Sequence, residues 1–79
     1  MTREGTVALY FRAKRYGFVD VPGEAGLDGV RYFFHANDFD GDEAEIKLGG
    51  TLRFRGLDTD RGPKAVDIEV VEAGDADEG

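Results

Sequence analysis

Short β-prone segments carry almost all of the apolar pattern in this chain of 79 residues. Five segments are predicted as strands: 5–11, 16–21, 30–35, 51–56 and 64–71. Glycine-, proline- and acid-containing connections separate them, and no long helical period occurs. Five short strands of this kind favour a small barrel, because closure leaves few exposed strand edges. We therefore predict an all-β domain over residues 1–72.

Alternation of apolar and polar residues within these strands predicts which side chains face the interior. The expected core is Val7, Val19, Val21, Val30, Tyr32, Phe34, Phe39, Leu48, Leu52, Phe54, Val66, Ile68 and Val70. Residues 36–39 are expected to form a short helical turn, and residues 40–48 an acidic connection anchored by Ile46 and Leu48. Residues 73–79 contain no large apolar side chain and are expected to form a disordered acidic tail.

The second and third predicted strands are rich in aromatic residues. Because side chains two positions apart share a strand face, Tyr16 and Phe18 lie on one face, and so do Phe33 and His35. If the two strands are neighbours, the four flat rings form one platform beside Lys14. Rings next to cations suit single-stranded nucleic acid, because every base offers a π-face.

Val19, Tyr32 and Phe34 lie on the opposite face of these strands. They are expected to face the interior, which leaves the platform on the outer face. Two alternatives stay open: rings hidden in a sheet buried on both faces, and an exposed apolar patch for protein contact. His35 is expected to stack on or hydrogen-bond a base, or else to make a structural hydrogen bond at a strand end. The chain has no serine or cysteine to pair with it as a nucleophile, so catalysis is not predicted.

The net charge of −7 is unusual for a nucleic-acid binder, but its distribution is uneven. Residues 1–19 carry four basic side chains and one acidic, and residues 51–66 carry four basic and two acidic. The other acids collect in 20–50 and 67–79. Because the screening length is about 8 Å at 0.15 M salt, local charge matters more than the total.

The basic residues that cluster with the aromatic segments are candidate phosphate contacts, with plain solvated charge as the alternative. They are Arg12, Lys14, Arg15 and Arg61, with Arg53 and Arg55 as further candidates on the fourth strand. The acid-rich stretch 38–45 has its glycine at the wrong place for an EF-hand calcium loop and lacks flanking helices. We predict a solvated loop there, not a metal site.

In order and spacing, these segments resemble the cold-shock domain family. The family motif K-G-F-G-F-[IV] corresponds to Lys14-Arg15-Tyr16-Gly17-Phe18-Val19, and V-F-V-H-F to Tyr32-Phe33-Phe34-His35-Ala36. The opening G-x-V-K-W-F-N corresponds to residues 5–11, and the late K-G-P turn to Arg61-Gly62-Pro63. The resemblance implies a five-stranded OB-fold Greek-key β-barrel that binds single-stranded RNA or DNA.

The chain departs from the family at several platform positions. The family's stacking Trp falls at Leu9, its neighbouring Lys at Ala8, and the last aromatic of the second motif at Ala36. Phe11 stands in place of a polar residue and is expected to restore part of the platform. Binding is therefore expected to be weaker than the family norm, or differently tuned.

The resemblance also implies roles for single residues. The expected nucleic-acid-binding residues are Leu9, Phe11, Lys14, Tyr16, Phe18, Phe33, His35 and Arg61. Bases would stack on Tyr16, Phe18, Phe33 and His35, while Lys14 and Arg61 would steer phosphates. Leu9 and Phe11 would extend the apolar surface.

The predicted function is binding of single-stranded RNA or DNA with low sequence specificity, as an RNA chaperone without cofactor, small-molecule substrate or enzyme activity. The alternative is a protein-interaction module whose aromatic face docks on another protein or on a second copy. A cytoplasmic location is expected, because the N-terminus lacks a secretion signal and no apolar run approaches the ~18 residues of a membrane span. The protein is also expected to be a monomer. Seven arginines, three lysines and seventeen acids resemble proteins of salt-loving archaea, with an ordinary acidic bacterial protein as the alternative.

Overall fold

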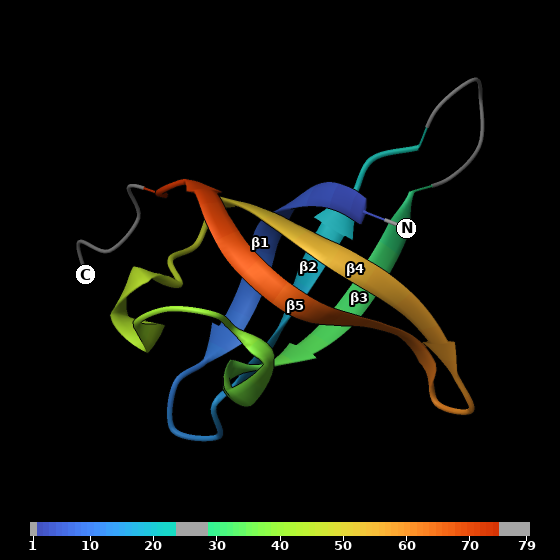
Figure 1. The fold of residues 1–79 in the computed structure, drawn as a ribbon, viewed down its shortest axis with the longest axis horizontal. Helices are drawn as coiled ribbons and strands as arrows, with labels where there is room; N and C mark the ends of the chain where they lie inside the picture. The colour runs from blue at the N-terminus through green and yellow to red at the C-terminus, as the bar shows by residue number, and fades with distance from the viewer. Residues whose placement is uncertain (1, 24–28, 75–79) are drawn as a thin grey trace.

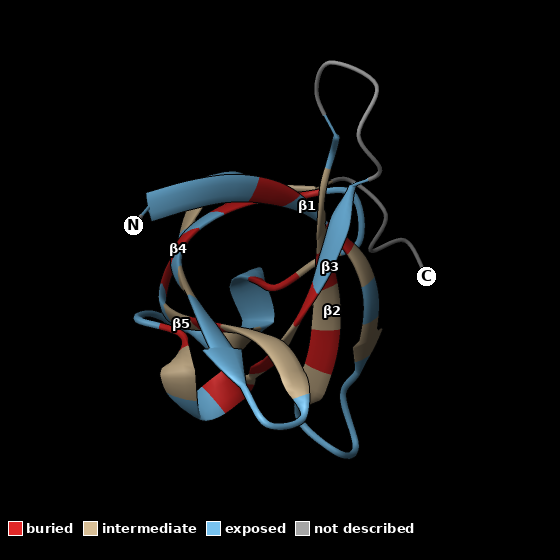
Figure 2. Cartoon of the chain, turned by 90° about the vertical axis from the view of Figure 1, so that its right-hand side faces the viewer, coloured by how far each residue is buried: buried red, intermediate tan, exposed pale blue. Residues whose placement is uncertain are grey.

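The computed structural model describes residues 2–23 and 29–74, which form a barrel of β-strands (Figure 1). The strands in these residues are β1 (Thr2–Phe11), β2 (Tyr16–Val21), β3 (Val30–His35), β4 (Thr51–Thr59) and β5 (Gly62–Glu72). Two short 3-10 helices, η1 (Ala36–Asp38) and η2 (Glu43–Glu45), lie between β3 and β4. The strands close in the order β1-β2-β3-β5-β4, and Figure 2 shows them as a ring. The predicted all-β, five-stranded OB-fold is confirmed.

The bounds of β2 and β3 are those predicted, whereas the other three strands are longer than expected. The hairpin between β4 and β5 is tighter than the predicted turn over 58–63, because Thr59 already pairs with Gly62. The Thr59 hydroxyl closes this hairpin by donating to the Gly62 carbonyl at 2.8 Å and accepting the Arg61 N–H at 3.1 Å. Most of the expected loop 24–29 and of the expected tail 73–79 lies outside the described residues.

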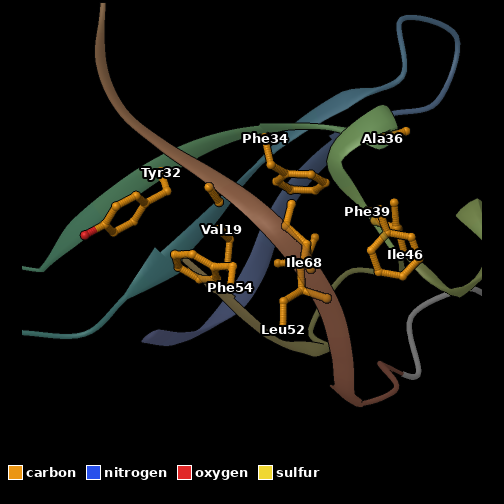
Figure 3. Close-up of a cluster of buried hydrophobic side chains, with 11 residues drawn as sticks. Val19, Tyr32, Phe34, Ala36, Phe39, Ile46, Leu52, Phe54 and Ile68 are labelled. Carbon is orange, nitrogen blue, oxygen red and sulfur yellow. The ribbon is translucent and has the colours of Figure 1, made fainter. Parts of the chain in front are cut away.

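The interior of the barrel is apolar, and Figure 3 shows its main side chains. The predicted core residues that prove buried are Val7, Val19, Tyr32, Phe34, Phe39, Leu52, Phe54 and Ile68. The prediction is wrong for Val30 and Leu48, which are 41% and 42% exposed. Val30 begins its strand, and Ile46 rather than Leu48 anchors the acidic connection, fully buried beside Phe39.

A β-bulge in β5 overturns part of the predicted alternation. The pairing of β4 with β5 slips by one residue between Arg53 and Arg55, and Asp67 adopts a left-handed conformation with φ 53°. An extra residue in one strand reverses the parity of everything beyond it. As a result, the side chain of Ala65 points into the core and is fully buried. Val66, which was predicted to face inward, is only partly buried.

A second bulge lies in β1 and decides which side chains of that strand face outward. Val7 pairs with Val19, whereas Leu9 pairs with Phe18, so one residue of β1 is left over between them. Val7 is buried, while Leu9 and Phe11 are 39% and 43% exposed. The bulge thus places Leu9 and Phe11 on the outer face.

Gly17 allows β1, β2 and β3 to approach closely at the centre of the curved sheet. It pairs with Tyr10 on one side and Phe34 on the other, and the rings of these two neighbours stack with centroids 5.8 Å apart. A Cβ on Gly17 would lie 2.3 Å from the Leu9 carbonyl oxygen. The glycine therefore permits the curvature that closes this side of the barrel.

Within residues 2–23 and 29–74, no helix is long and apolar enough to cross a bilayer.

Candidate nucleic-acid interface

Six of the eight predicted site residues form a two-by-three grid on the outer face of β1, β2 and β3. The strand register aligns Phe11, Tyr16 and His35 in one row and Leu9, Phe18 and Phe33 in the next. Two features produce this grid: the β1 bulge, and the period-two alternation of β2 and β3. All six side chains keep part of their surface in solvent.

Four rings of the grid, Phe11, Tyr16, Phe18 and Phe33, make one continuous surface that we call the ring patch. Tyr16 is its centre, with ring centroids 5.4 Å from Phe11, 5.4 Å from Phe33 and 6.3 Å from Phe18. Phe18 and Phe33 close the set at 5.8 Å. Contacts in this range hold the rings against one another without burying them, so the patch is a preformed apolar surface.

An ion pair bounds the ring patch at one end. In the next row of the sheet, Asp20 faces Arg31, and both oxygens of the carboxylate accept from the guanidinium, at 2.7 and 3.0 Å. The hydrogen bond from Arg31 lowers the pKa of Asp20, so this carboxylate stays charged at neutral pH. The apolar surface therefore ends at this row.

The two predicted phosphate contacts flank the ring patch. Lys14 is exposed in the turn between β1 and β2, directly before Arg15 and Tyr16. Arg61 lies at the tip of the β4–β5 hairpin, where it lines a groove of about 570 Å³ with Phe18, Phe33 and Lys64. Across the described part of the chain, neither Lys14 nor Arg61 forms an ion pair.

The other candidate cations are already engaged. Arg53 bonds to carboxylates on β1 and β5, and Arg55 pairs with Asp67 at 2.8 Å. Arg12 donates to the Ile46 carbonyl at 3.2 Å, and its guanidinium carbon lies 5.2 Å from the centre of the Tyr10 ring. Arg53 and Arg55 are thus paired with acids of the β1–β4–β5 wall, and neither of them lines the groove beside Phe18 and Phe33.

His35 makes a structural hydrogen bond and also belongs to the grid. Its Nδ1 accepts the backbone N–H of Asn37 at 3.0 Å and so caps η1. A neutral imidazole that accepts at Nδ1 carries its proton at Nε2, which leaves that nitrogen as a donor. The two expectations for His35 are therefore compatible.

A polar cluster joins the barrel to η2 beside the ring patch. The Tyr10 hydroxyl donates to Glu43 Oε2, and Arg15 Nε approaches Glu43 Oε1 at 3.3 Å. Partial burial and the hydrogen bond to Glu43 raise the pKa of Tyr10 from 10.0 to about 12. The same bond, with help from Arg15, lowers the pKa of Glu43. Glu43 is thus held as a carboxylate, and Tyr10 as a neutral phenol, at neutral pH.

This cluster predicts a pH dependence of stability in the alkaline range. Because folding raises the Tyr10 pKa, its contribution is complete below about pH 10 and is lost as the pH rises towards 12. Urea unfolding midpoints measured from pH 9 to pH 11.5 should fall more steeply for the parent than for Tyr10→Phe, in which nothing ionises at this position. Parallel pH profiles for the two proteins would contradict the assignment.

Sequence reasoning missed two residues near the interface. Lys64 lines the groove and approaches Asp38 at 3.7 Å, and its place directly after Pro63 in the late turn was a usable signal. Glu43 had no local signal, because its partners Tyr10 and Arg15 are 33 and 28 residues away in the sequence. In the described ranges, no cluster of three histidine or acidic side chains is arranged to hold a metal ion.

The geometry defines a small OB-fold barrel with a ring patch that is partly exposed to solvent. No protein-family model matches the chain, and no curated protein matches it. Among solved structures, the one titled "drosophila Unr CSD456" aligns with 100% of this chain, with a TM-score of 0.66 and 19% sequence identity. The chain corresponds to 29% of the length of that structure. At this identity the likeness establishes the shared fold alone, that of a closed five-stranded β-barrel.

Proposed function

We propose that the protein binds single-stranded RNA or DNA on the ring patch, with low sequence specificity. The observation that carries the proposal is the two-by-three grid, in which Phe11, Tyr16, Phe18 and Phe33 form a preformed surface open to solvent. Bases stack on such rings with roughly 1–3 kcal/mol each, and stacking is tolerant of sequence because every base has a π-face. The likeness to a cold-shock domain in fold supports the same assignment.

The net charge of −7 opposes binding of a polyanion in general, but three acids next to the patch are paired, whereas Asp60, in the groove with Arg61, has no ion pair among the described residues. Asp20 is bonded to Arg31, Glu43 to Arg15, and Asp38 lies near Lys64. The two cations that flank the rings, Lys14 and Arg61, remain available to phosphates. We infer that the protein acts as a monomeric RNA chaperone, which shifts hairpins towards open strands by mass action.

Affinity should depend only weakly on salt, because few cations serve the interface. For single strands the slope of log K against log salt is about −0.7 per neutralised phosphate. Contacts from Lys14 and Arg61 then predict a slope of about −1.4, and Lys14→Gln should make the slope shallower, at about −0.7. Fluorescence anisotropy of a labelled pyrimidine-rich oligonucleotide at several salt concentrations measures both. A slope of zero for the parent would exclude the proposed phosphate contacts.

A second use of the ring patch is docking on another protein or on a second copy of the chain, which the net charge of −7 favours over a polyanion. Sedimentation velocity with and without the oligonucleotide separates the two functions. Nucleic-acid binding predicts a monomer that becomes heavier by one oligonucleotide. Self-docking predicts a dimer without ligand, and Phe33→Ala would dissociate it.

A further inference from the structure

Arg15 occupies an unusual place beside the proposed interface. It lies in the turn between Lys14 and Tyr16 with φ 61°, a left-handed conformation that costs little only for glycine. Its carbonyl oxygen accepts the Ala36 N–H at 2.8 Å, which ties the turn to the end of β3 next to His35. Few residues other than glycine adopt this conformation, so the contacts of the arginine side chain are of interest.

The guanidinium of Arg15 is occupied by groups of this chain. Its Nε approaches Glu43 Oε1 at 3.3 Å, and its Nη1 approaches Asn37 Oδ1 at 3.4 Å. Arg15 nevertheless keeps 49% of its side chain exposed, whereas Glu43 keeps 28%. The cation can therefore be reached from solvent while its carboxylate partner is the more sheltered member of the pair.

Glu43 is held in place independently of Arg15. The Tyr10 hydroxyl donates to its Oε2, and Tyr10 is in turn fixed by the stack of its ring on Phe34. The backbone around Glu43 is fixed as well, because Asp42 accepts the Ala44 N–H at 3.0 Å and so caps η2. A carboxylate anchored in this way presents oxygens to a guanidinium much as a phosphate does.

We propose that Glu43 sets the affinity of the interface by competing with the phosphates of the bound strand for Arg15. The inference rests on the proposed function, because it requires a polyanion on the ring patch. The strand must displace an anchored carboxylate before Arg15 can bind a phosphate. In the parent, Glu43 keeps Arg15 occupied, so the strand contacts Lys14 and Arg61. Arg15 becomes a third phosphate contact when Glu43 is neutralised. A protein with Glu43 neutralised binds the same strand more tightly and with a steeper dependence on salt.

The test is the affinity of Glu43→Gln for a fluorescein-labelled oligothymidylate of about eight nucleotides, a length within the range of OB-fold sites. Glutamine keeps an acceptor for Tyr10 and removes the charge. We expect binding about two- to fivefold tighter than that of the parent, the range of one exposed charge contact. The salt slope should become steeper by about 0.7, which corresponds to one more phosphate.

Two variants separate this competition from a general effect of charge. Glu69→Gln removes an acid that also pairs with an arginine, Arg53 at 3.2 Å, but on the β4–β5 side of the barrel. It should leave affinity within about 1.5-fold of the parent, since a distant exposed charge is screened. Arg15→Gln combined with Glu43→Gln should bind no more tightly than Arg15→Gln alone.

Each outcome decides the matter. If the parent binds the strand and Glu43→Gln binds it equally tightly, the proposed competition is wrong, and the proposed function is unaffected. A gain that persists without Arg15, or that Glu69→Gln reproduces, would overturn it too, because the cause would then be net charge. Absence of binding by both parent and Glu43→Gln would overturn the proposed function, and this inference with it. Amide spectra of each variant verify the fold.

Discussion

Replacing Tyr16 and Phe33 together by alanine should weaken binding of a pyrimidine-rich single strand by about thirtyfold or more, while the barrel stays folded. Each ring is worth roughly 1–3 kcal/mol per stacked base, so the loss of two corresponds to at least about 2 kcal/mol. The expected loss is large because Tyr16 contacts three other rings of the patch and Phe33 contacts two. Removing both leaves Phe11 and Phe18 without a ring between them.

The matched control is Val71→Ala, which shortens an apolar side chain that is 44% exposed on β5, outside the ring patch. Val71→Ala should bind the strand as tightly as the parent does. This result would exclude a general loss of exposed apolar surface as the cause of the weaker binding of the double variant. Circular dichroism shows whether the double variant is folded, and anisotropy titration gives its affinity. Affinity unchanged from the parent in a folded double variant would contradict the assignment of the ring patch.

Gly17→Ala should destabilise the barrel by about 3 kcal/mol, the upper end of the range for overpacking. The new Cβ would lie 2.3 Å from the Leu9 carbonyl oxygen and 2.9 Å from Tyr10 Cδ1. The first of these atoms belongs to the backbone of β1, which cannot retreat without loss of its pairing to β2. A domain of this size has a total stability of roughly 4–12 kcal/mol, so the effect is a large fraction of it.

Gly49→Ala separates the steric clash from the loss of glycine flexibility. Gly49 has φ 83°, and no heavy atom lies within 4 Å of the position that a Cβ would take there. Alanine at this position should therefore cost only the left-handed conformation, about 1 kcal/mol. Urea unfolding with a common m-value gives both differences in the free energy of unfolding. Equal costs for the two variants would show that close approach of the strands at Gly17 is not what the glycine provides.

The strand pattern was predictable where aromatic and β-branched residues alternate without interruption. In β2 and β3 this alternation fixes both the bounds and the outward parity of Tyr16, Phe18 and Phe33, and the structure has them as expected. The register between the strands adds what alternation alone cannot, namely that Tyr16 faces His35 and Phe18 faces Phe33.

The bulges were not predictable, because their cause is the closure of the barrel and not the local residue types. In β1, strict alternation would put Val7, Leu9 and Phe11 on one face, and only the bulge separates Val7 from the other two. Asp67 can adopt a left-handed conformation more easily than most residues, but many aspartates do not. The wrong inward assignment of Val66 follows from that extra residue.

Contacts between distant segments were also hidden from the sequence. The acid-rich stretch 38–45 was expected to be a solvated loop, and most of it is exposed, yet Glu43 reaches Tyr10 and Arg15. Charge counts alone could not show that Arg53 and Arg55 are paired with acids while Lys14 has no ion pair among the described residues. Pairing depends on three-dimensional neighbours, which composition does not contain.

The most direct test of the central claim is a titration of the ¹⁵N-labelled protein with a short single-stranded oligonucleotide, followed by amide chemical shifts at low and high salt. Binding on the ring patch predicts that the largest changes fall on residues 16–18, 33–35 and 61–64, and that they diminish as salt rises. Unchanged spectra at both salt concentrations, or changes confined to the outer face of β4 and β5, would contradict the account.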